Sequence, residues 1–449
     1  MLKKIIQRIK ETEVKEQNFE RRYPLKKVKV FKKKEDFKKI FLAQGEKNLE
    51  LMQKIPNRVK SMAYFDEIWK SEKRIKEIED FRKAGGKIIG IFCNFVPEEL
   101  IYAAGCLPIR ICAGFYETIE IAEEILAKDI CPLIKSSLGF RLAGLPYFSL
   151  CDLVIIPVSC DGKKKLGEIL SDYLEVWFLE LPASKDRLQS KEFWFKEIKI
   201  LKKKLEKLSG NEVTFVKLKR AIELCHLRQV VFRRFDEIRQ STNPLISGRD
   251  ALLVTQMSFF DDLERWTEKT EKLCQELNEN REKSLAICPT QTPRLLFTGS
   301  PIIWPNYKFL NIVEEFGGIV AGDTFCSGTQ YLYNPVEIDE WVMEEMLEAI
   351  AERYLLPSIC PCFTESNDRI DNLFQMIKDF KIDGVIYHQL RLCQLYDIEF
   401  YKVKQVLGQK NVPLLRIQTD YSQEDVEQIK TRVEAFLEMI KGKKHEPFQ

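Results

Sequence analysis

Residues 87–112, KIIGIFCNFVPEELIYAAGCLPIRIC, decide the fold that the sequence predicts. Two short β-branched apolar runs, 87–93 and 107–112, flank a segment that starts with Pro97-Glu98-Glu99 and stops at Gly105. Proline in a first turn, and acids near the positive end of the helix dipole, are typical of helix starts. The stretch therefore predicts a strand, a helix and a second strand, the repeating unit of a parallel sheet.

The same pattern recurs on both sides of a long helical stretch. Six further apolar runs fit buried strands: 153–160, 175–182, 294–301, 318–326, 383–390 and 412–420. Continuous apolar strands separated by long helical connections indicate parallel sheets that are covered on both faces. The predicted fold class is therefore α/β, with two Rossmann-like, doubly wound parallel-sheet domains.

The other segments show helical periodicity. Residues 1–86 are dense in charge and carry apolar residues at helical spacing, and 184–285 contains long amphipathic runs without a strand pattern. We expect the chain to divide into an N-terminal helical region, a first α/β domain, a helical insert and a second α/β domain. The predicted bounds are 1–86, 87–183, 184–285 and 286–449.

Composition excludes several classes of partner. The chain has 449 residues with 71 basic and 68 acidic side chains, and this near balance does not favour nucleic-acid binding. No apolar run reaches the roughly 20 residues that cross a bilayer, and the N-terminus lacks the pattern of a secretory signal. We expect a cytoplasmic protein that binds neither nucleic acid nor membrane.

Cysteine is abundant and histidine scarce, with 13 cysteines and 3 histidines. Cys93 and Cys160 close predicted strands of the first sheet, Cys326 closes a strand of the second, and Cys393 lies shortly beyond another. The carboxyl ends of parallel strands meet at one edge of the sheet, where ligands bind. We therefore expect these four thiols to share that edge.

Helix starts supply the remaining candidates. Cys131 precedes Pro132 at the start of one predicted helix, and Cys360 and Cys362 precede another that begins near Ser366 or Asn367. The helix dipole lowers the pKa of a thiol and favours the thiolate that metals require. With one of Cys360 and Cys362, six thiolates face one cleft.

So many thiolates and so few imidazoles favour an iron–sulfur cluster. Zinc is less favoured because the paired C-x₂-C spacing of structural zinc sites is absent, and the simplest alternative is that each cysteine is a small buried hydrophobe. That structural role is predicted for the other six cysteines: Cys106, Cys112, Cys151, Cys225, Cys274 and Cys288.

These residues and their surroundings resemble the 2-hydroxyacyl-CoA dehydratase and benzoyl-CoA reductase component family. The resemblance covers most of residues 87–440, in family order. The matching segments are CNFVPEELIYAAGCLPIRI, CPLIKSSLGF, SCDGKKK, RLLFTGSP, EEFGGIVAGDTFCSGTQ, KIDGVIYHQLRLC and PLLRIQTDYSQEDVEQIKTRVEAFLEMI. It implies an oxygen-sensitive iron–sulfur enzyme from an anaerobe, a homodimer, and a partner ATPase that carries its own cluster and delivers low-potential electrons.

The resemblance implies two possible cofactors. Dehydratase subunits hold one 4Fe–4S cluster through positions that correspond to Cys93, Cys131 and Cys393. The additional thiols resemble the branch with a double-cubane 8Fe–9S cluster, whose members reduce small, hard-to-reduce molecules. Those thiols are Cys160, Cys326 and one of Cys360 and Cys362.

The predicted function is therefore that of an iron–sulfur reductase with a double-cubane cluster. Two alternatives stay open: a subunit of a radical 2-hydroxyacyl-CoA dehydratase with one 4Fe–4S cluster, and a non-catalytic iron–sulfur electron-transfer protein. No P-loop occurs in the sequence, so ATP is expected to bind to the partner. Lys163 to Lys165, beside Cys160, form a hypothetical docking surface for that partner, and a solvated helix face is the alternative.

Candidate proton donors occur at two places. His388 lies at the end of a predicted strand with Tyr387 and Arg391, where it can donate a proton or orient a substrate, or simply belong to the core. Glu98 and Glu99 can relay protons, although stabilising their helix through its dipole also explains them.

Overall fold

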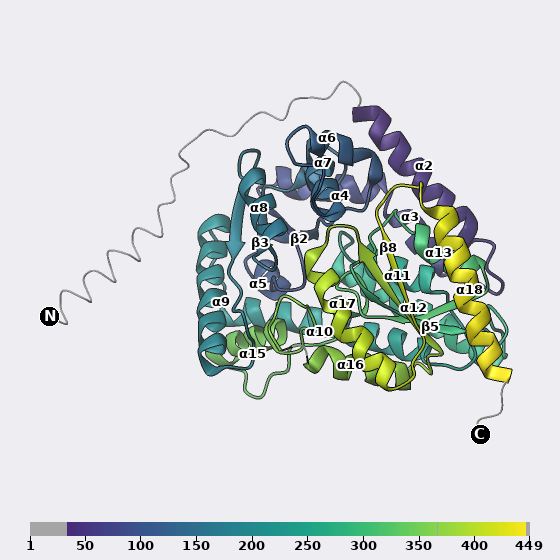
Figure 1. Ribbon diagram of the computed structural model, residues 1–449. Helices are drawn as coiled ribbons and strands as arrows, with labels where there is room; N and C mark the ends of the chain where they lie inside the picture. The colour runs from purple at the N-terminus through teal and green to yellow at the C-terminus, as the bar shows by residue number, and fades with distance from the viewer. Residues whose placement is uncertain (1–33, 366, 446–449) are drawn as a thin grey trace.

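The computed structural model describes residues 34–365 and 367–445, and it contains two four-stranded parallel sheets (Figure 1). The order is β2-β1-β3-β4 in the first sheet and β6-β5-β7-β8 in the second. The strands are β1 (Ile88–Ile91), β2 (Leu107–Arg110), β3 (Leu153–Pro157), β4 (Glu175–Leu179), β5 (Arg294–Gly299), β6 (Ile319–Asp323), β7 (Gly384–Leu390) and β8 (Leu414–Thr419). All eight lie within the predicted runs, so the α/β fold with two parallel sheets is confirmed.

Each sheet has one point at which the direction of strand addition reverses. β1 pairs with β2 on one side and β3 on the other, and β5 pairs in the same way with β6 and β7. Such a switch point opens a crevice beyond the carboxyl ends of the two central strands. The fold therefore provides two equivalent crevices, one in each sheet.

Burial of the strands differs between the centre and one edge of each sheet. β1, β3, β5, β6 and β7 are buried along their whole length, as the continuous apolar runs predict. β4 and β8 are partly exposed, with Glu175, Phe178 and Gln418 at the surface. An apolar run does not distinguish a central strand from an edge strand, which explains why the sequence overestimates the burial of these two.

Helices connect the strands of both sheets. In the first half they are α5 (Glu98–Ala103), α6 (Ile119–Glu123), α7 (Pro132–Leu142) and α8 (Asp161–Leu170). In the second half they are α13 (Lys308–Glu315), α14 (Thr329–Leu332), α15 (Met343–Leu355), α16 (Asn367–Asp379), α17 (Gln394–Gln409) and α18 (Val426–His445). None of the helices in the described part of the chain is long and apolar enough to cross a bilayer.

The N-terminal region and the insert are helical, as predicted. Before the first sheet lie α2 (Lys34–Met52), α3 (Met62–Ile68) and α4 (Glu72–Lys83). The insert contains α9 (Leu188–Ser209), α10 (Phe215–Arg239), α11 (Gly248–Met257) and α12 (Leu263–Glu282). Residues 1–33 of the predicted helical region lie outside the described residues.

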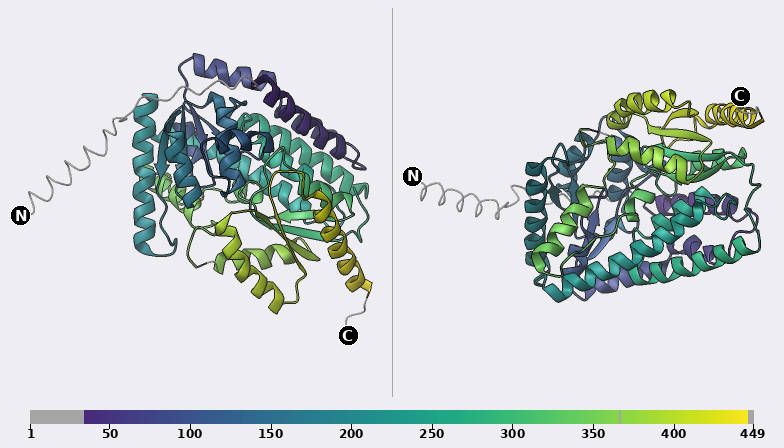
Figure 2. Two further views of the ribbon diagram at one scale, coloured as in Figure 1. Left: turned by 45° about the horizontal axis from the view of Figure 1, so that its top comes forward. Right: turned by 90° about the horizontal axis from the view of Figure 1, so that it is seen from below.

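The insert is packed against both halves. α10 packs along α12 and against α5, and Figure 2 shows long teal helices of the insert running along one side of the molecule. α9 lies at the outer side of the first half and packs against α15 (Figure 1). One hydrophobic core extends from Phe41 to Ile440 and includes buried residues of all four predicted segments, whose bounds stay a prediction.

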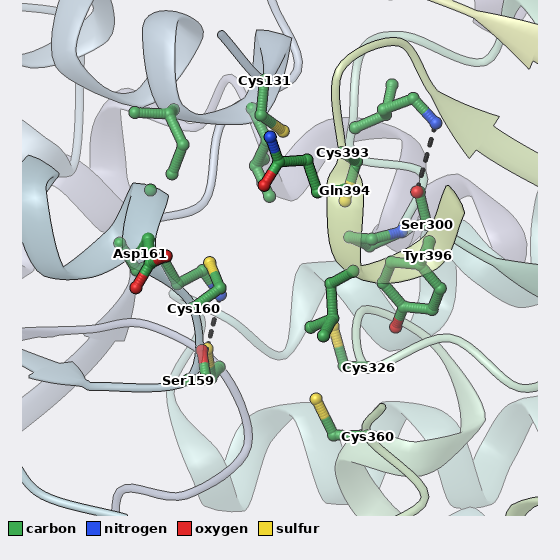
Figure 3. A pocket seen from close by; sticks show the side chains of 18 of the residues that line it. Cys131, Ser159, Cys160, Asp161, Ser300, Cys326, Cys360, Cys393, Gln394 and Tyr396 are labelled. Atoms are coloured by element: carbon green, nitrogen blue, oxygen red, sulfur yellow. Dashed lines mark hydrogen bonds between the residues drawn. The ribbon is translucent and has the colours of Figure 1, made fainter. Parts of the chain in front are cut away.

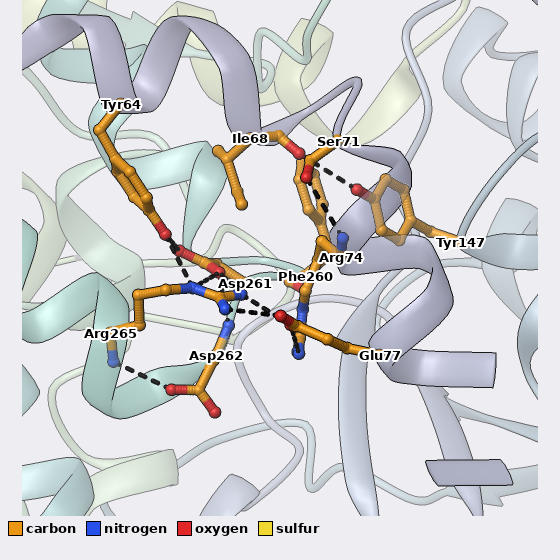
Figure 4. Close-up of polar contacts among 10 residues, drawn as sticks. All are labelled: Tyr64, Ile68, Ser71, Arg74, Glu77, Tyr147, Phe260, Asp261, Asp262 and Arg265. Carbon is orange, nitrogen blue, oxygen red and sulfur yellow. Dashed lines mark hydrogen bonds and ion pairs between the residues drawn. The ribbon is translucent and has the colours of Figure 1, made fainter. Parts of the chain in front are cut away.

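A polar network joins the N-terminal helices to the insert (Figure 4). Arg265 of α12 forms ion pairs with Glu77 of α4 at 3.0 Å and with Asp261 at 2.7 Å. The hydroxyl of Tyr64, on α3, donates a hydrogen bond to the Asp261 carboxylate. Because the Asp261 side chain is completely buried, Arg265 supplies the charge that compensates it.

We expect Arg265→Met to lower the free energy of unfolding by about 2–4 kcal/mol, because the Asp261 carboxylate then stays buried without its cation. Arg220→Met is the matched control, since Arg220 pairs with Glu264 at 3.4 Å and both side chains are exposed. Its expected cost is below about 1 kcal/mol. Urea denaturation followed by circular dichroism measures both, and equal losses would contradict the role assigned to Arg265.

Candidate functional site

A cavity of about 720 Å³ lies beyond the carboxyl ends of the strands of both sheets. Its lining includes Ser159, which follows β3, Ser300, which follows β5, and Thr324, which follows β6. Figure 3 shows cysteine side chains directed into one central space from several segments. Six cysteines line the cavity: Cys93, Cys131, Cys160, Cys326, Cys360 and Cys393.

Three of these cysteines occupy helix N-cap positions. Cys131 caps α7, Cys160 caps α8 and Cys393 caps α17. The free N–H groups of a first turn and the helix dipole favour negative charge at such positions. The predicted place of Cys131 at a helix start is confirmed. For Cys160 and Cys393 the sequence indicated only a strand end, and the helix that follows adds a second source of stabilisation for a thiolate.

Sharp turns direct two of the lining segments. Cys93 follows β1 with a φ of 57°, in the left-handed region that side chains other than glycine rarely adopt. Leu392, directly before Cys393, has a φ of 61°. Both turns follow a central strand at a switch point, and strained backbone of this kind is concentrated at functional sites. Cys326 lies in the turn before α14, and Cys360 lies in the irregular segment between α15 and α16.

In two pairs of hydrogen-bonded thiols, the pKa of one thiol is lowered and that of the other is raised. A hydrogen bond from Cys131 lowers the pKa of Cys393 to about 6 and raises that of Cys131. A hydrogen bond from Cys362 likewise lowers the pKa of Cys360 to about 7. In each pair, a cavity-lining sulfur with a lowered pKa is therefore joined to a neighbour with a raised pKa.

Burial has the opposite effect on the remaining lining thiols. It raises the pKa of Cys326 to about 12, and it also raises the pKa of Cys160. Charges of Arg110 and Lys163 oppose this increase at Cys326. These sulfurs therefore need a bound cation or metal to hold them as thiolates.

Lys163 is the site residue that sequence reasoning misplaced. Its side chain is buried, and its ammonium donates a hydrogen bond to Cys93 Sγ. Lys164 and Lys165 are exposed, so the hypothesis of one docking surface from Lys163 to Lys165 is wrong for Lys163. The sequence did indicate that Lys163 is buried. Lys163, Leu166 and Leu170 lie three and four residues apart and therefore share the buried face of α8.

The predicted acids lie outside the cavity lining. Glu98 forms a buried ion pair with Arg228 at 2.6 Å and accepts a hydrogen bond from the Tyr331 hydroxyl. Glu99 accepts one from the Tyr354 hydroxyl at 2.8 Å. Both carboxylates thus hold α5 against neighbouring helices.

His388 and Cys362 also lie outside the lining, as do Tyr387 and Arg391. His388 Nδ1 is 2.6 Å from the carbonyl oxygen of Ser300, which can only accept, so this ring nitrogen carries the proton. Burial lowers the pKa of His388 to about 4. A neutral His388 therefore ties β7 to the end of β5, directly behind the cavity wall.

The six cysteines that the sequence assigned to structural roles are absent from the cavity lining. Burial raises the pKa of Cys106 to about 11 and that of Cys274 to about 12, so these stay neutral thiols. Cys112 differs in position, because it packs against the same small apolar cluster as Cys131 and Cys393. Like Cys362, it is therefore a thiol that lies close to the site without lining the cavity.

Residues 93–440 match the family described as the D-component of 2-hydroxyglutaryl-CoA dehydratase, and the chain belongs to this family. It is 34% identical to the putative dehydratase subunit YjiM of Escherichia coli, over 81% of this chain and 94% of that protein. It is 24% identical to the (R)-phenyllactyl-CoA dehydratase beta subunit of Clostridium sporogenes, with the same coverage. Identity is 18% with one of the subunits of the benzoyl-CoA reductase of Thauera aromatica, over 79% of this chain and 91% of that protein.

The low pKa of His388 predicts a specific loss of stability in acid. An unfolded histidine titrates at about 6.5, whereas His388 titrates at about 4 in the fold. The unfolded chain therefore binds the proton first, so the contribution of His388 is complete above pH 6.5 and is lost as the pH falls toward 4. At pH 4.5 the expected loss is about 2.5 kcal/mol.

Metal-free wild type and His388→Gln test this in urea at pH 7 and pH 4.5. Glutamine can still donate to Ser300 but does not titrate. From pH 7 to pH 4.5, the free energy of unfolding of wild type should fall by about 2.5 kcal/mol more than that of His388→Gln. Parallel pH profiles would show that His388 has the same pKa in the native and unfolded states, and would contradict its low pKa in the fold.

Proposed function

We propose that the protein is an iron–sulfur reductase that holds a double-cubane 8Fe–9S cluster in the cavity and reduces small, hard-to-reduce molecules. One observation supports this above all others: each half contributes three cysteines to the lining of the same cavity. The family resemblance assigns a single 4Fe–4S cluster to Cys93, Cys131 and Cys393. That cofactor leaves three lining thiols unused: Cys160, Cys326 and Cys360.

The residues present fit an extended cluster better than a single ion. Within residues 34–365 and 367–445, no three Cys, His, Asp or Glu side chains are grouped closely enough to hold one metal ion. Six thiols spaced around about 720 Å³ suit a group with several irons, which would need several thiolate ligands. The absence of any histidine from this lining also suits iron–sulfur ligation.

The chain's own residues would bind this group and control its surroundings. A bound cluster of this kind supplies electrons of low potential. The six lining thiols hold it, and the Ser300 hydroxyl hydrogen bonds to Cys393. Leu133, Ile134 and Leu390 contribute buried apolar wall, which keeps water away and strengthens electrostatic interactions inside.

Electron delivery in this proposal needs a second protein. The sequence has no P-loop, so ATP hydrolysis belongs to a separate iron–sulfur activator. Relatives named as beta subunits support a multi-component system. We place this system in the cytoplasm of an anaerobe and propose that the chain forms a homodimer there.

A second candidate is a subunit of a radical 2-hydroxyacyl-CoA dehydratase with one 4Fe–4S cluster. The names of two relatives favour it, because the proteins from Clostridium sporogenes and Acidaminococcus fermentans are dehydratase beta subunits. In that case Cys93, Cys131 and Cys393 bind the cluster and the rest of the cavity accepts a CoA thioester.

Metal analysis separates the two candidates. Protein purified without oxygen should contain about eight irons and nine sulfides per chain, and Cys160→Ala or Cys326→Ala should lose most of them. Cys225→Ala and Cys274→Ala are matched controls, because both thiols are buried outside the cavity lining. About four irons, unchanged in all variants, would favour the dehydratase. A cluster without turnover with any donor would favour an electron-transfer protein.

We propose that Cys360, and not its neighbour Cys362, is the iron ligand. Cys360 lines the cavity and Cys362 does not, so we expect Cys360→Ala to lose iron and Cys362→Ser to retain it. Serine keeps a hydrogen-bond donor toward Cys360, which makes the comparison one of iron binding. Iron content and the electron paramagnetic resonance spectrum of the reduced proteins are the measurements. Iron lost only from Cys362→Ser would assign the ligand to Cys362.

A further inference from the structure

Two buried cations border the cavity on the side of Cys93. Lys163 is 9% exposed and Arg110, the last residue of β2, is 3% exposed. Lys163 donates its hydrogen bond to Cys93 Sγ. Lys163 lines the cavity, and Arg110 Nη1 donates to Oδ1 of the lining residue Asn94 at 2.6 Å. We refer to Lys163 and Arg110 as the cationic pair.

Arg110 is held firmly but is not neutralised. Its guanidinium carbon lies 4.8 Å from the centroid of the Phe259 ring and 4.7 Å from that of Tyr331. These contacts fix the plane of the group. Its Nε and Nη2 are buried and have no hydrogen-bond partner among the described residues. A buried arginine with two unsatisfied hydrogen-bond donors is stabilised by negative charge nearby.

Other buried cations in the described part of the chain meet their partners within the protein. Arg228 pairs with Glu98 at 2.6 Å and Lys308 pairs with Asp425 at 2.6 Å. Arg294 donates to three backbone carbonyls instead. Within residues 34–365 and 367–445, neither member of the cationic pair forms an ion pair with a carboxylate. A buried charge without an opposite charge is strongly unfavourable, so these two side chains lower the stability of the fold unless an anion lies nearby.

The pair meets sulfur and an amide oxygen at the cavity instead of carboxylates. Lys163 donates to Cys93 Sγ, and Arg110 donates to Asn94 Oδ1. The position of Lys163 in the first turn of α8 is also unfavourable, because the positive end of the dipole repels a cation. Neither burial nor the helix dipole favours the positive charge of Lys163 at this position.

We propose that the cationic pair is a fixed counter-charge for the anionic group held by the lining cysteines, and that it raises the reduction potential of that group. This inference rests on the proposed function. Reduction adds one electron to a group that already carries thiolate charge, so nearby cations stabilise the reduced state more than the oxidised state. Because both cations are buried, water and salt screen them weakly. Neither cation is an iron ligand.

Potentiometric titration of the anaerobic protein, followed by visible and electron paramagnetic resonance spectra, tests the proposal. Lys163→Met and Arg110→Met should titrate at more negative potential than wild type, because each removes one buried positive charge. Arg110→Lys keeps the charge and should restore the wild-type value. Lys164→Met is the matched control, because it removes an exposed charge from the same turn of α8 and should leave the potential unchanged.

Lys163→Gln separates charge from hydrogen bonding, because glutamine still donates to Cys93 but is neutral. It should shift the potential in the same direction as Lys163→Met. A wild-type potential in Lys163→Gln would show that the hydrogen bond matters and would overturn the counter-charge. It also provides a polar replacement where Lys163→Met fails to fold, which circular dichroism of the metal-free protein detects.

Iron content distinguishes failure of this inference from failure of the proposed function. Variants that retain iron at the wild-type potential would overturn the counter-charge and leave the proposed function intact. A wild-type protein that holds no iron would overturn both. Loss of iron from folded Lys163→Met, with iron retained in Lys164→Met, supports the pair as a requirement for holding the anionic group.

Discussion

Parallel pairing of β1 and β5, each with a neighbour on both sides, is the constraint on which the site depends. It creates a switch point in each sheet, and the carboxyl ends of the central strands open into the same cavity. Gly299 shows how closely the second switch point is built, because a Cβ there would lie 2.1 Å from the carbonyl oxygen of His388. Only glycine accepts that approach together with a φ of 108°.

The chain surrounds the cavity with features that favour negative charge at sulfur. Helix starts at Cys131, Cys160 and Cys393 point their dipoles toward it, and the cationic pair lies on the side of Cys93. Burial and shared protons raise the pKa of several of these thiols. In the proposed function, a bound iron–sulfur group would replace those protons.

The sequence by itself determined the local structure and the family. Apolar runs predicted eight strands, because a strand that is buried on both faces is a continuous run of apolar residues. The ends of those runs placed Cys93, Cys160 and Cys326 at strand termini, and the resemblance implied a thiolate-rich site. Cys131 before Pro132 marked a helix start.

Only the tertiary structure decided which side chains meet. Cys360 and Cys362 have nearly identical sequence surroundings, and one lines the cavity while the other does not. Lys163 meets Cys93 across 70 residues and Glu98 meets Arg228 across 130. Helix and strand propensities act over neighbouring residues, whereas these contacts depend on how two sheets and an insert pack. The residue pattern of one segment therefore does not identify the distant side chain that packs against it in the fold.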